Sequence, residues 1–161
     1  MDKESNLENF KKDYEILKEK YSLPDFDEFN REFNIEKLAD METDYLIREI
    51  RKVITDKFAS YVRFVEVFLH TANAPMFIFS LMKIISVEDK KILGKIYERL
   101  AKSEIRVVTL DLNFSEESEV EFVKSAYLMW KEVKSDLLKF VKKLEDNWDV
   151  KPEVNGKNYF G

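Results

Sequence analysis

Glycine and proline are so scarce in this chain that it has few places to turn. There are three of each among 161 residues, about a third of the number that an average chain of this length contains. Turn-dense all-β folds and disordered segments both use these residues heavily, so their scarcity disfavours both classes. Hydrophobic residues make up 45% of the chain, which is enough for one core. We therefore predict an all-α fold in a single domain with few connections.

Two long amphipathic segments are predicted to frame this domain. From about residue 42 to 71, and again from about 115 to 147, apolar residues recur every three or four positions and so share one face of a helix. Ser115 precedes the second segment and is followed by acids, as at a helix N-terminus. We expect a bundle of five to six helices over residues 1–148, followed by a short polar tail at 149–161.

The boundaries of the other helices are predicted from local signals. Asp25 and Glu28 have the spacing of a capping box, and Asn73 is expected to end the first frame helix in a left-handed conformation. The segment 76–85 is apolar on nearly every side, so we expect it to be the most buried helix. Residues 105–114 alternate like a strand but have no second strand to pair with, which favours a continued helix or an extended connector.

The composition excludes several kinds of chemistry. The chain has no cysteine, and therefore no disulfide, thiol nucleophile, cysteine-ligated zinc or iron–sulfur cluster, and a reducing, cytoplasmic location is expected. Its three glycines, Gly94, Gly156 and Gly161, match neither the GxGxxG pattern nor the complete P-loop pattern, so we expect no glycine-rich phosphate-binding loop. The N-terminal residues do not resemble a signal peptide, and charges interrupt the most apolar stretch, so we expect neither export nor insertion into a membrane.

A single histidine, His70, limits catalysis and metal binding further. It follows Glu66 by four residues, which suits two ligands on one helix face, but the same stripe has the mixed charges of a solvent-facing surface. One histidine cannot supply the Glu-x-x-His pair of a di-iron bundle, and no serine lies in a nucleophile elbow. We therefore predict no catalytic residue, no metal site and no cofactor.

Aromatic and methionine side chains in the middle of the chain predict a protein-binding surface. Phenylalanine occurs thirteen times, and a helical domain of this size has limited area in which to bury so many rings. Methionine beside phenylalanine is typical of surfaces that bind a partner helix, although packing in the core would explain the same pattern. The main hypothesis is a non-enzymatic interaction or assembly protein that binds a protein partner or forms a homodimer. The candidate residues are Phe64, Phe68, Met76, Phe77, Phe79 and Met82.

A lysine stripe on the last helix supports a first alternative, a nucleic-acid or ribonucleoprotein accessory factor. The net charge of −5 argues against a broad positive field, but the stripe is locally basic. The acidic segment 25–44 offers a structural role instead, because the two charges could face each other within the fold or between subunits. A second alternative, a small-ligand binder or enzyme, would need an enclosed inter-helix cleft with converging acids. The candidate phosphate contacts are Lys124, Lys131, Lys134, Lys139 and Lys142.

Several stretches of the chain resemble known proteins. These are Leu-Pro-Asp-Phe-Asp-Glu-Phe-Asn at 23–30, Asn-Ala-Pro-Met at 73–76 and Ser-Val-Glu-Asp-Lys-Lys at 86–91. Together with the helix around Trp130 and the closing Tyr-Phe-Gly at 159–161, they resemble a group of small helical archaeal proteins of uncharacterised function. The resemblance implies an archaeal cytoplasm and no particular activity.

Overall fold

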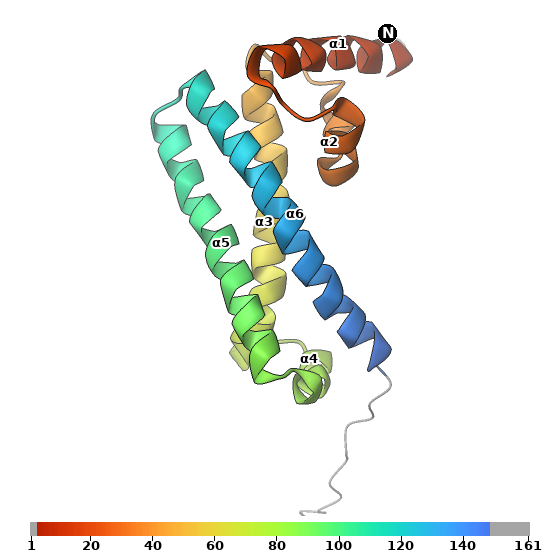
Figure 1. Cartoon of the computed structure of the whole chain (residues 1–161), viewed down its shortest axis with the longest axis vertical. Coiled ribbons are helices and arrows are strands. Elements are labelled where there is room, and N and C mark those ends of the chain that lie inside the picture. The colour runs from red at the N-terminus through yellow and green to blue at the C-terminus, as the bar shows by residue number, and fades with distance from the viewer. Residues whose placement is uncertain (1–2, 149–161) are drawn as a thin grey trace, which may run out of the picture.

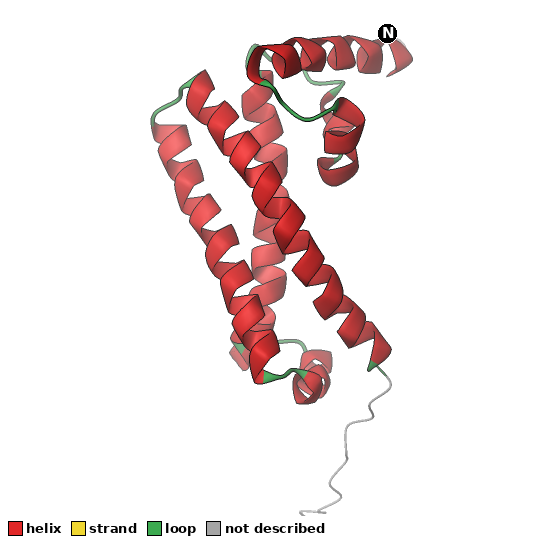
Figure 2. Cartoon of the chain, in the orientation of Figure 1, coloured by secondary structure: helices red, strands yellow, loops and turns green. Residues whose placement is uncertain are grey.

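The computed structural model describes residues 3–148, which form six α-helices and three short 3-10 helices without a strand among them (Figure 2). The predicted all-α class is confirmed, and the tail at 149–161 lies outside the described residues. The elements are α1 (Lys3–Tyr21), α2 (Phe26–Phe33), η1 (Ile35–Leu38), α3 (Leu46–Leu69), η2 (Thr71–Asn73), α4 (Met76–Leu81), η3 (Met82–Ile84), α5 (Val87–Leu112) and α6 (Glu116–Asp146).

Three long helices, α3, α5 and α6, form the body of the domain (Figure 1). The two predicted frame helices are present as α3 and α6 and pack against each other, but the most extensive contact of α3 is with α5. α5 runs antiparallel to both of the others and returns into α6 through the short loop 113–115. The frame therefore consists of three helices instead of two.

The two ends of this three-helix body are closed by different short elements. α1 crosses one end, with α2 beside it, and α4 lies at the opposite end (Figure 1). α2 turns Phe29 and Phe33 into the core, where both rings pack against Tyr127 of α6. The Tyr14 hydroxyl of α1 donates a 2.8 Å hydrogen bond to the Pro24 carbonyl and so fixes the turn between α1 and α2.

The helix starts agree only in part with the sequence signals. Ser115 caps α6 as predicted, because its side chain accepts a hydrogen bond from the backbone N–H of Ser118. The predicted capping box at Asp25 is wrong: Asp25 precedes α2, but its side chain makes no capping bond and its carboxylate lies 2.7 Å from the Lys18 ammonium. An available cation has therefore replaced the backbone as partner of this acid.

The segment between α3 and α5 differs most from expectation. α3 ends at Leu69, with His70 at its C-terminus, so Asn73 does not end it in a left-handed conformation. The segment 76–85 is not one central helix, because α4 has six residues and η3 follows it. It is not the most buried helix either, since only Ile78 and Leu81 of α4 are buried. The reason is its position, because an element at the end of a bundle has core on one side only.

Residues 105–114 mostly continue a helix, as one of the two favoured interpretations predicted. α5 extends to Leu112, so the extended-connector alternative is wrong. Its twenty-six residues also contain Gly94, at which an added Cβ atom would meet open space. Within residues 3–148, no helix is both long enough and apolar enough to cross a membrane.

Candidate interaction site

The six predicted partner-binding residues do not lie on one surface. Phe68 is buried, and its ring packs edge-on against Phe140 of α6, with 5.1 Å between centroids. Phe64 packs on Phe68 at 5.3 Å and is half-buried. Met82 is half-buried against the core. These three residues therefore join α3, α6 and η3 and leave little surface for a partner.

The other three residues, all on α4, are exposed. Met76 is 89% exposed, and about half of each ring of Phe77 and Phe79 faces solvent. Ile78 and Leu81 occupy the inward side of the helix, which leaves the others on its outward side. The Phe77 ring lies 6.0 Å from that of Trp148, which follows α6 and is also exposed. We call Met76, Phe77, Phe79 and Trp148 the α4 surface.

A second exposed apolar surface, which the sequence interpretation missed, lies on α5. Leu112 is 83% exposed and Ile105 is 72% exposed, with Val108 exposed between them. Their spacing of three and four residues places them on one helix face, and Ala101 continues the row one turn earlier. We call Ala101, Ile105, Val108 and Leu112 the α5 stripe. The signal was present, but the alternation of Val108 and Leu112 with polar residues was interpreted as a strand-like period.

The lysine stripe and the acidic segment face each other within the fold, as one of the stated alternatives predicted. The Lys131 ammonium lies 2.7 Å from Glu28, and the Lys134 ammonium lies 2.8 Å from Glu32. The Trp130 indole N–H donates a further 2.9 Å hydrogen bond to Glu32. Glu28 and Glu32 are one turn apart on α2, so two matched pairs hold α2 along α6.

The pKa values of the two carboxyls follow from these contacts. Hydrogen bonds from Lys131 and Tyr127 hold the pKa of Glu28 below its usual value. Burial alone would raise the pKa of Glu32, but the hydrogen bonds from Lys134 and Trp130 outweigh burial and lower it. Both acids are therefore stabilised in the charged form, as expected of groups whose role is to pair with lysine.

The remaining lysines of the stripe are placed differently. Lys124 donates a 3.0 Å hydrogen bond to the Tyr21 carbonyl at the end of α1. Lys139 lies 3.6 Å from Asp136 on its own helix, and both it and Lys142 are exposed. The stripe thus contributes several of its charges to contacts within the chain, which leaves fewer of them for phosphate.

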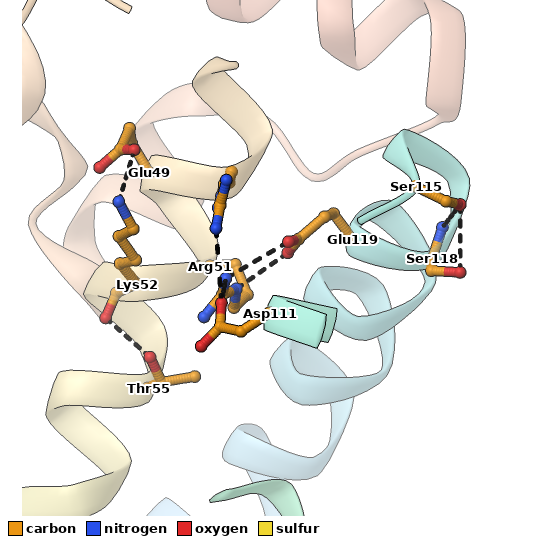
Figure 3. Close-up of polar contacts among 9 residues, drawn as sticks. Glu49, Arg51, Lys52, Thr55, Asp111, Ser115, Ser118 and Glu119 are labelled. Atoms are coloured by element: carbon orange, nitrogen blue, oxygen red, sulfur yellow. Dashed lines mark hydrogen bonds and ion pairs between the residues drawn. The ribbon is translucent and has the colours of Figure 1, made fainter. Parts of the chain in front are cut away.

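A buried charged cluster joins the three long helices near the α1 end of the body (Figure 3). Arg51 of α3 is 2% exposed and Glu119 of α6 is fully buried. The Arg51 Nε donates to Glu119 at 2.9 Å, and Nη2 donates to Glu119 at 3.3 Å and to Asp111 of α5 at 2.6 Å. Arg48 approaches the same Asp111 at 3.7 Å, but its Nε is buried without a hydrogen-bond partner among residues 3–148.

This cluster has the properties of a structural ion pair. Burial alone would lower the pKa of the Arg51 guanidinium, but the hydrogen bonds to Glu119 and Asp111 outweigh burial and raise it. The sequence interpretation missed Arg51 and Glu119. The signal was their place in the apolar stripes, because Arg51 lies between Ile50 and Ile54, and Glu119 precedes Val120.

Two surface hollows are relevant to the hypothesis of a ligand-binding cleft. One of about 410 Å³ lies between α2 and α3, with Phe33 and Lys57 in its lining. Another of about 330 Å³ is lined in part by Asp13, Asp44 and Glu116. Both hollows are open to solvent. In the described part of the chain, no three acidic or histidine side chains converge as a metal site requires.

Comparison of the chain with protein-family models, with curated proteins and with solved structures found no match. The resemblance to helical archaeal proteins therefore stays a prediction, and functional inference depends on the surfaces described above.

Proposed function

We propose that the chain is a non-enzymatic interaction protein that binds another protein through the α4 surface. The observation that carries this proposal is the exposure of three large apolar side chains within one six-residue helix. An exposed group of this kind, with Trp148 added beside Phe77, is typical of a binding site.

The position of α4 and the charge around it indicate the kind of partner. α4 lies at one end of the body with its outward side uncovered (Figure 1), and a groove in a partner is the shape that receives an exposed helix side. The charges around the α4 surface are mixed, because Lys83 of η3 is exposed next to α4, and Glu145 and Asp146 are exposed just before Trp148. The partner chemistry that fits best is therefore an apolar groove whose rim carries both acidic and basic groups.

The proposal is tested with the tagged full-length chain, expressed in the organism that encodes it. Met76→Ser combined with Phe77→Ser reduces the apolar area of the α4 surface and leaves Ile78 and Leu81 in the core. A matched control, Ile16→Ser with Leu138→Ser, removes apolar side chains of α1 and α6 that are also more than half exposed.

We expect the wild-type chain and the control to purify with one other protein at fixed stoichiometry, measured by light scattering, and the α4 variant to purify alone. Circular dichroism spectra that coincide for all three chains show that the variants are folded. The absence of a stoichiometric complex, or a complex that the α4 variant retains, would overturn the proposal.

A further inference from the structure

The α5 stripe has the spacing of a helix-pairing seam. Ala101, Ile105, Val108 and Leu112 follow one another at intervals of four, three and four residues, which is the pattern of alternate seam positions in a coiled coil. They lie on the side of α5 opposite Leu110, which is buried against the body. No other helix lies outside α5 in the described part of the chain (Figure 1).

The sizes of these side chains fit an antiparallel pairing of α5 with itself. A twofold axis between Ile105 and Val108 sets Ile105 against the partner's Val108, and Ala101 against the partner's Leu112. Ala101, the smallest side chain of the stripe, then faces Leu112, the most exposed one. The twofold axis generates a second copy of each of the two contacts. A parallel pairing would set Ala101 against the partner's Ala101 and leave a gap at that end.

The charges beside the stripe fit the same pairing. Glu104 is half-buried and forms no ion pair among residues 3–148, and Arg48, whose side chain is 34% exposed, forms one there, a 3.7 Å contact with Asp111. In the antiparallel arrangement, Glu104 lies next to the partner's Asp111 and therefore next to the partner's Arg48, which approaches Asp111 to 3.7 Å. Repulsion between the two acids is limited, because Asp111 is already bonded to Arg51 at 2.6 Å.

From this complementarity of size and charge we infer that a second copy of this chain covers the α5 stripe, in an antiparallel α5–α5 homodimer. This inference concerns a different surface from the proposed function and does not depend on it. In this dimer the α5 stripe of each copy covers that of the other. Glu104 of each copy pairs with the partner's Arg48, so this ion pair occurs twice.

The oligomeric state of the full chain tests the interface. We expect sedimentation equilibrium to give twice the chain mass for the wild type and the single-chain mass for Ile105→Ser with Leu112→Ser. Leu128→Ser with Leu138→Ser is the matched control, because these leucines of α6 are also more than half exposed but lie off the stripe. A wild-type monomer at micromolar concentration, or an equal loss of dimer in the control, overturns the inference.

The direction of the pairing is tested by cross-linking, for which the absence of cysteine gives a clean background. We expect an oxidised mixture of Ala101→Cys and Leu112→Cys chains to form a covalent dimer of one chain of each kind, and each variant alone to form none. A covalent dimer of Ala101→Cys with itself would show a parallel pairing and overturn the antiparallel one.

These outcomes can be distinguished from failure of the proposed function. The variant Met76→Ser with Phe77→Ser changes only the α4 surface and is expected to remain dimeric. A monomeric wild-type chain that still binds a partner through α4 would remove the dimer and leave the proposed function in place.

Discussion

Removal of the Arg51 side chain should destabilise the three-helix body strongly, because it leaves a buried charge without a partner. In Arg51→Met the fully buried carboxylate of Glu119 loses the only hydrogen-bond donor found for it among residues 3–148. Asp111 is affected less, because it is half-exposed and water can replace the guanidinium. The free-energy cost therefore comes mainly from Glu119.

The size of the effect follows from the burial of the pair. Breaking a buried ion pair by removing one partner costs about 3–5 kcal/mol, because the other charge is left uncompensated. Replacing both members by apolar residues, in Arg51→Met with Glu119→Leu, removes the uncompensated charge, so we expect stability within about 1 kcal/mol of the wild type. Arg99→Met is the matched control. It breaks an exposed pair with Glu132, and such pairs contribute about 1 kcal/mol or less.

Urea unfolding followed by circular dichroism, at one fixed low protein concentration, measures these differences through the midpoint and slope of each transition. We expect Arg51→Met to have the lowest midpoint, with the double variant and Arg99→Met both near the wild type. A cost below about 1 kcal/mol for Arg51→Met, or a double variant as unstable as the single one, would refute the argument that an unpaired buried charge dominates.

Three further predictions concern packing, capping and pH. Phe68→Ala should destabilise the chain by about 3–5 kcal/mol in urea unfolding, whereas Phe77→Ala, at an exposed ring, should change stability by about 0.5 kcal/mol or less. Ser86→Ala removes the capping box at the start of α5 and should cost about 1 kcal/mol, measured by thermal unfolding. The pKa of Glu28 is lowered in the folded chain, so its contribution to stability is present above its ordinary value of 4.5 and is lost as the pH falls below it. When the pH is lowered below 4.5, the urea midpoint of the wild type should therefore decrease more than the urea midpoint of Glu28→Gln. Equal decreases would contradict this role for the ion pair between Glu28 and Lys131.

The elements that the sequence predicts well are those in which apolar periodicity and burial agree. α3 and α6 have a continuous apolar face, and each lies within a few residues of its predicted bounds. The last part of α5 was not assigned to a helix with certainty from the sequence, because Val108, Leu110 and Leu112 alternate with polar residues, and of these three only Leu110 is buried. A helix with apolar residues on two faces has no single dominant period, so its pattern alone cannot separate core from surface.

The six predicted partner-binding residues show more clearly that a sequence pattern alone does not separate core from surface. Phe68 and Phe77 are chemically identical, yet one packs in the core and the other faces solvent. What separates them is their position along the body, because α3 is covered along its length whereas α4 lies at its end. The contact of the lysine stripe with α2 could be predicted, since Glu28 and Glu32 repeat at the one-turn interval that Lys131 and Lys134 approximately match.

The two apolar surfaces have a combined consequence if both proposals hold. α4 lies next to the start of α5 (Figure 1), and the α5 stripe occupies the second half of that helix. An antiparallel α5 pair would therefore set the two α4 surfaces at opposite ends of the dimer, where neither blocks the other. A dimer of this kind would hold two partner molecules at once, and its two equal sites would strengthen attachment to any partner that is itself repeated. If both proposals hold, such a dimer would therefore act by bridging, with one partner molecule at each end.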